Sequence, residues 1–116
     1  ESKKYDKKVS IDLIDFYGVP AILIEESFSK MWREIGLSLD RSGLVVTDQN
    51  RDKAIYIIST NQISNKETSY EIKLTKRKDK YIITAHKLNK SKISNKDARK
   101  ILKHIIYAYS SNIAKN

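Results

Sequence analysis

Only a few side chains in this sequence could act as catalysts, and their spacing does not assemble a site. The chain has two histidines, His86 and His104, and no cysteine. Neither histidine has a metal ligand or a carboxylate at a useful spacing, and three glycines are too few for a phosphate-binding loop. The adjacent pair Glu25 and Glu26 is explained by its place at the positive end of a predicted helix. We therefore predict that the chain is not an enzyme and holds no metal or cofactor.

The charge of the chain is strongly positive and unevenly distributed. The net charge is +9. Residues 1–48 carry seven Lys or Arg and nine Asp or Glu, a balance of −2, whereas residues 49–116 carry sixteen and five, a balance of +11. This asymmetry is typical of a domain with an anionic partner, although a solvated basic surface gives the same pattern. A polyanion-binding or nucleic-acid-binding domain therefore stays open as an alternative function.

Aromatic residues among the cations raise the question of base stacking. Tyr70 and Tyr81 stand near several lysines, as do the aromatics of single-strand binders. However, Tyr70 has the same phase as Ile72 and Leu74, which places it on the core face of a strand. The twelve Lys and Arg of residues 73–103 are mostly lysine, whereas arginine is favoured for reading bases. We predict a diffuse basic surface and no specific nucleic-acid binding.

Four polar residues beside a predicted helix end and a predicted turn are the candidates for contact with a partner protein. Asp40 and Arg41 occupy the last turn of the helix, and Asp48 and Arg51 bracket a short polar connection. We expect Arg51 to pair with Asp48 or Asp40, and Asp48 to accept turn amides. Polar residues held by tight connections often form recognition surfaces, although a structural capping and turn network explains them too. A second candidate for partner contact is the arm at residues 9–16, since apolar edge segments can pair with another chain.

Four other residues of the same region are predicted to form structural core. Phe28, Trp32 and Leu39 recur at helical spacing on one apolar stripe, with Trp32 as the largest anchor. Gly36 lies one turn after Trp32, where the lack of a side chain allows the helix to approach a sheet closely.

Hydrophobic periodicity and turn residues divide the chain into short elements. Residues 9–17 are apolar without a clean period and predict an edge strand with a bulge, or an arm. One helix is predicted to start after the cap Ser27 and to stop at Gly43, and a second to start after the cap Ser94. Strands are predicted over residues 21–24, 44–47, 54–60, 70–75 and 81–85, with turns at 48–52 and 77–80. The last helix is expected to bury Ala98, Ile101, Leu102, Ile105, Tyr109 and Ile113.

This order, β-α-β-β-β-β-α with a possible extra strand at the start, predicts an α+β fold. Consecutive strands with short connections form antiparallel sheets, and two amphipathic helices are buried most simply on one face of such a sheet. A length of 116 residues suits one domain. We expect an N-terminal arm at 1–17 and a single domain at 18–116, with no apolar run near the ~20 residues of a membrane span.

One run of residues resembles the domains of the BamC (NlpB/DapX) lipoprotein family. It begins with Gly18-x-Pro20 and an Ile/Leu strand, ends at Tyr56, and between them includes Phe28 and the pattern Trp32-x-x-Ile35-Gly36-x-x-Leu39-Asp40-Arg41-x-Gly43-Leu44-x-Val46-x-Asp48-x-x-Arg51. The similarity continues more weakly through residues 70–74 and 98–102. Ala54 departs from the pattern, because glycine is common there. Family members usually hold two such domains, so this chain is either a fragment or a shortened homologue.

The resemblance implies a helix-grip fold and a scaffolding role in the outer-membrane β-barrel assembly machine, with BamD and BamA as partners. It also implies a monomer in isolation, held at the periplasmic face of the outer membrane by an acylated cysteine upstream of Glu1. Because helix-grip relatives can hold a ligand between sheet and helix, a carrier of a small apolar molecule is a second alternative. The Ile and Tyr residues of the short sheet are expected to fill that space.

Overall fold

Six strands and two helices make up the part of the chain that the computed structural model describes, residues 10–114. Side-chain burial is described for residues 10–109, so the expected burial of Ile113 and the start of the arm lie outside it. The elements are β1 (Ser10–Phe16), β2 (Val19–Glu25), α1 (Phe28–Arg41), β3 (Val45–Asn50), β4 (Ile55–Thr60), β5 (Thr68–Arg77), β6 (Lys80–Lys87) and α2 (Asn95–Ala114).

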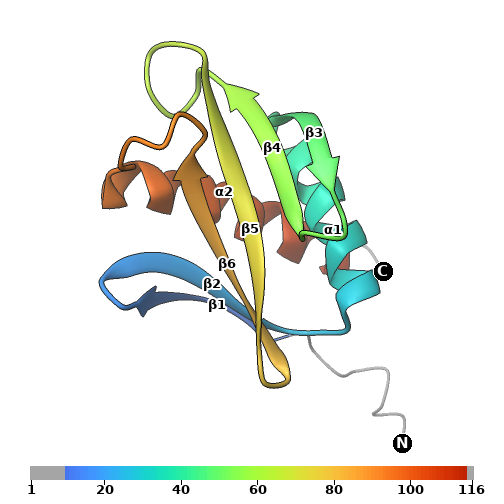
Figure 1. Ribbon diagram of the computed structural model, residues 1–116. Helices are drawn as coiled ribbons and strands as arrows, with labels where there is room; N and C mark the ends of the chain where they lie inside the picture. Colours follow the sequence, from blue (N-terminus) through green and yellow to red (C-terminus); the bar gives the residue numbers. More distant parts are fainter. Residues whose placement is uncertain (1–9, 115–116) are drawn as a thin grey trace, which may run out of the picture.

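All strand pairs are antiparallel, and the strands form one sheet in the order β1-β2-β6-β5-β4-β3. Both helices lie behind this sheet in Figure 1, and they also contact each other. The predicted α+β class with an antiparallel sheet is confirmed. The first apolar segment is an edge strand, β1, which forms a hairpin with β2. The predicted bulge in it is wrong, because the register runs unbroken from Ser10 opposite Glu25 to Phe16 opposite Val19.

The prediction placed the turn after the third strand too early. Residues 48–50 look like a turn because they are polar, yet they continue β3, and the turn follows at 51–54. An edge strand with exposed residues tolerates such polarity. The pairing of β3 with β4 shifts between Val46 and Asp48, which identifies a bulge at Thr47.

Helix α1 ends as the sequence predicts. Gly43 has φ +80°, its amide donates to the carbonyl of Asp40, and the amide of Leu44 donates to that of Leu39. These two bonds satisfy the last carbonyls of the helix. At the other end Ser27 is the N-cap residue, but its side chain does not cap; instead Glu26 accepts a hydrogen bond from the Ser27 amide. In α2 the predicted cap is present, since the Asp97 amide donates to Ser94 Oγ at 3.0 Å.

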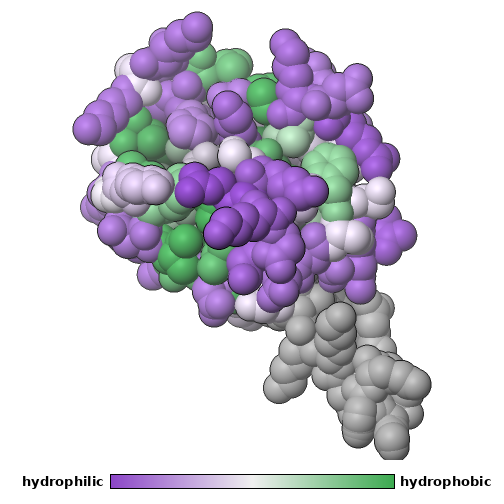
Figure 2. Space-filling model, turned by 60° about the horizontal axis from the view of Figure 1, so that its bottom comes forward, coloured by the Kyte–Doolittle hydropathy of each residue, from purple (hydrophilic) through white to green (hydrophobic). Residues whose placement is uncertain are grey.

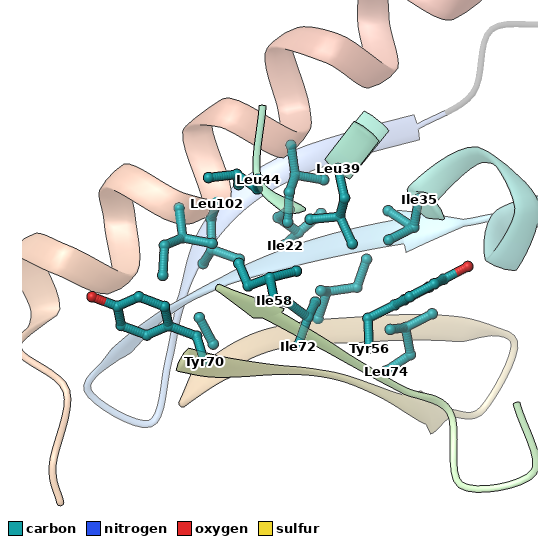
Figure 3. Packing of buried hydrophobic residues seen from close by; sticks show 14 of the residues in the cluster. Ile22, Ile35, Leu39, Leu44, Tyr56, Ile58, Tyr70, Ile72, Leu74 and Leu102 are labelled. Carbon is teal, nitrogen blue, oxygen red and sulfur yellow. The ribbon is translucent and has the colours of Figure 1, made fainter. Parts of the chain in front are cut away.

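The core lies between the sheet and the two helices (Figure 3). Its fully buried side chains include Tyr70, Ile72, Ile101, Leu102, Ile105 and Tyr109. Tyr70 therefore faces the core, as its phase predicted. In Figure 3, Tyr70 points from the sheet toward α2 and Tyr56 toward α1. The space between sheet and helices is thus occupied by the protein's own side chains.

Candidate partner-binding groove

A surface groove runs between α1 and the strands β3 and β4. It is lined from the helix by Ser29, Trp32, Arg33, Gly36, Leu37 and Asp40, and from the sheet side by Val46, Gln49, Arg51 and Tyr56. The helix residues recur every three or four positions, so they share one face of α1. From Ser29 to Asp40 this face extends about 16 Å at the helical rise of about 1.5 Å per residue. We call this feature the α1–β3 groove.

Trp32, Gly36 and Tyr56 form the base of the groove. The rings of Trp32 and Tyr56 stack with centroids 4.1 Å apart, and the Tyr56 hydroxyl donates to the Trp32 carbonyl at 2.8 Å. A Cβ atom at Gly36 would lie 2.6 Å from that hydroxyl oxygen, so only glycine permits this approach of helix and sheet. Burial raises the pKa of Tyr56 to about 12, and the nearby Arg51 charge opposes this shift. The base is therefore rigid and neutral at ordinary pH.

Arg51 closes one end of the groove. Its guanidinium donates to Ser29 Oγ at 3.0 Å and lies over the Phe28 ring, 5.5 Å from the centroid. The predicted pairing of Arg51 with Asp48 or Asp40 is wrong: the hydroxyl and the aromatic face of α1 are its partners instead. Because the helix contributes this contact, spacing along the chain could not reveal it.

The four predicted contact residues are thus not one cluster. Asp40 and Arg51 line the groove near opposite ends. Asp48 lies opposite Ile57, on the sheet face away from the helices, and its carboxylate accepts the amide of Gln49 at 2.8 Å rather than a turn amide. Arg41 is exposed in the last turn of α1, outside the groove lining.

Sequence reasoning missed the apolar edge of the groove. Leu37 is 40% exposed and lies outside the buried stripe of α1, and Val46 is half-buried on the side of β3 that faces the helix. The signal available was Leu37 itself, an apolar residue on the polar face of an amphipathic helix. Leu37 and Val46 give the groove an apolar edge, and Arg33 and Asp40 add exposed charges, a combination suited to a peptide or protein surface.

The histidines and carboxylates of residues 10–114 do not gather into a metal-binding group. No group of three or more His, Asp or Glu converges there. His104 bonds with the Lys100 carbonyl through Nδ1 at 2.7 Å. His86 lies opposite Glu71 in the register of β5 and β6, on the sheet face without helices, and its Nε2 bonds with Thr84 at 2.8 Å.

The lysines of the second half are less dispersed than predicted. Four lysines line one hollow at the end of β6 together with Glu71: Lys73, Lys87, Lys90 and Lys92. On the face that Figure 2 shows, hydrophobic patches are interrupted by hydrophilic side chains. No described helix is long and apolar enough to cross a bilayer.

Comparison with known proteins identifies the domain. The family model of the outer membrane protein assembly factor BamC-like C-terminal domain matches residues 11–108, from β1 into α2. The chain belongs to this family. The resemblance found in the sequence to BamC domains is thereby confirmed. This BamC-like domain includes all six strands, both helices and every residue of the α1–β3 groove.

Two BamC proteins are similar to part of the domain. The outer membrane protein assembly factor BamC of Accumulibacter regalis is 42% identical over 41 residues, which is 35% of this chain and 11% of that protein. The protein of the same name from Thiobacillus denitrificans (strain ATCC 25259 / T1) is 43% identical over 35 residues, 30% of this chain and 10% of that protein. The matched segments thus span about a tenth of these relatives.

Proposed function

We propose that this BamC-like domain is a non-enzymatic accessory of the outer-membrane β-barrel assembly machine and acts by binding other proteins. Its family supports a role in outer membrane protein assembly. The observation that carries the binding mode is the α1–β3 groove, whose base is held by Trp32 and Tyr56 and whose edge exposes Leu37. Hot spots of protein binding are enriched in Trp, Tyr and Arg, and Trp32, Tyr56 and Arg51 all line this groove.

The partners and the location follow from the same proposal. We infer that the groove contacts BamD or BamA, at the periplasmic face of the outer membrane, with a lipid anchor upstream of Glu1. The filled core between sheet and helices supports this role over that of a carrier for an apolar ligand. The lysine hollow is lined by no arginine, the residue favoured for reading bases, so it does not by itself favour a nucleic-acid reader.

Binding to purified BamD and BamA of the same bacterium tests the proposal. Leu37→Glu would place a charge at the exposed edge of the groove while leaving the core intact. We expect stability within about 0.5 kcal/mol of the unchanged protein, and affinity lower by at least about tenfold.

The matched control is Tyr107→Glu, which makes the same kind of change on α2 at a residue that is 78% exposed. It should leave affinity unchanged. The proposal is wrong if neither subunit binds, or if both variants bind as well as the unchanged domain.

A further inference from the structure

The two edges of the sheet differ in how they are protected. At the β3 edge, Thr47 forms a bulge, and the Asp48 carboxylate accepts a hydrogen bond from the amide of Gln49. Bulges and charges of this kind prevent pairing with another strand. At the other edge, β1 pairs with β2 over seven consecutive positions without a shift. It contains neither proline nor lysine, and its charged side chains are Asp12 and Asp15, which repel an acidic strand but not a basic one.

The hairpin turn determines which backbone groups of β1 face outward. Tyr17 and Gly18 form a two-residue turn with φ of +51° and +84°. Such a turn makes its flanking residues, Phe16 and Val19, a hydrogen-bonded pair. Alternation then directs the N–H and C=O groups of Ile11, Leu13 and Asp15 away from β2. Among residues 10–114, no strand other than β2 pairs with β1.

The side chains of the β1 edge indicate the charge of a partner strand. Asp12 and Asp15 are exposed, and neither forms an ion pair or a hydrogen bond within the described part of the chain. They lie on opposite faces of the strand because they are three positions apart. Between them stand Leu13 and Ile14, both half-buried. The edge therefore presents the order acidic, apolar, apolar, acidic.

We propose that the β1 edge binds an extended segment of another protein as an added antiparallel strand, with basic residues opposite Asp12 and Asp15 and apolar residues opposite Leu13 and Ile14. Backbone hydrogen bonds supply affinity in such complexes and the facing side chains supply selectivity. A second copy of β1 fits less well. Antiparallel pairing about Leu13 would bring two Asp12 carboxylates together as diagonal neighbours on one face without a cation.

This binding site lies on the sheet edge opposite β3 and does not depend on the α1–β3 groove. The probe is a synthetic peptide with the order threonine, lysine, valine, valine, lysine, threonine, extended by threonine at both ends. A second peptide has glutamate in place of lysine. A third is N-methylated at the valine that faces Leu13. Titration into the isotope-labelled protein at low salt is followed by NMR and by amide hydrogen exchange.

The lysine peptide should slow exchange at the amides of Ile11, Leu13 and Asp15, and the N-methylated peptide should not. The variant D12K/D15K should bind the lysine peptide at least about tenfold more weakly and gain binding to the glutamate peptide. That gain requires a folded edge, so loss of folding cannot imitate it.

Three results would overturn the proposal. The first is no protection of these three amides by the lysine peptide at any reachable concentration. The second is an affinity that D12K/D15K leaves unchanged. The third is protection of the same amides without peptide together with a dimer in sedimentation, which would identify a second copy of the chain as the occupant.

Discussion

The Tyr56 hydroxyl reaches the backbone carbonyl of Trp32 at 2.8 Å, and the two rings stack with centroids 4.1 Å apart. This contact joins α1 to β4 across the base of the α1–β3 groove. It depends on the absence of a side chain at Gly36, one turn further along the helix. The shape of the groove is thus fixed by three residues from two elements.

Gly36→Ala should destabilise the domain by up to about 2 kcal/mol. The added methyl group meets the Tyr56 hydroxyl, and overpacking of this kind costs about 1–3 kcal/mol, which the better helix propensity of alanine offsets by about 1 kcal/mol. Denaturant melts measure the change. In a Tyr56→Phe background the clashing oxygen is gone, so the cost should shrink. An equal cost in both backgrounds would show that the clash lies elsewhere.

Tyr56 should also make stability depend on alkaline pH. Because burial raises its pKa from 10.0 to about 12, folding favours the neutral phenol. Its contribution is complete below pH 10 and is lost as the pH rises through about 12. The difference in unfolding free energy between the unchanged protein and Tyr56→Phe should therefore be constant up to pH 10 and fall above it. A difference that grows above pH 10 would contradict the assignment.

The sequence predicted the fold well because the signals involved are local. The helix stop at Gly43, the cap at Ser94 and the alternation around Tyr70 each depend on neighbours within a few residues. The position of β3 was missed because its bulge at Thr47 and its polar residues are indistinguishable from a turn without the pairing to β4.

The candidate site was less predictable because its contacts join distant elements. Arg51 bonds with Ser29, 22 positions away, so spacing suggested the nearer Asp48 instead. The groove residue Leu37 becomes meaningful only when β3 is known to lie beside α1.

Ala54→Gly should stabilise the domain by about 0.5–1 kcal/mol. Ala54 has φ +58°, a conformation that strains any residue with a Cβ atom. The same strain explains why glycine is common at this position in the BamC-family pattern. Thermal and denaturant melts measure the change in the free energy of unfolding. Ala98→Gly, within α2, is the control and should destabilise. Lower stability of Ala54→Gly would show that the turn does not carry this strain.

The hydroxyl groups of two buried tyrosines should not contribute to the stability of the domain. Tyr70 and Tyr109 are fully buried, and their hydroxyl oxygens have no hydrogen-bond partner among the described residues. Replacing either tyrosine with phenylalanine should be neutral or stabilising, because an unsatisfied buried hydroxyl loses its hydration without compensation. Tyr56→Phe, which removes a bonded hydroxyl, should instead cost about 0.5–1.5 kcal/mol. A comparable loss in all three variants would mean that the first two hydroxyls are paired.

Site-specific crosslinking from the groove can show whether the α1–β3 groove contacts BamD or BamA. The chain has no cysteine, so a single one introduced as Leu37→Cys or, as control, Tyr107→Cys can carry a photoreactive group at one position only. After illumination with purified BamD and BamA, we expect an adduct with one of them from position 37 and none from position 107. Equal adducts from both positions, or none from position 37 while the subunits still bind the domain, would contradict the groove as the partner surface.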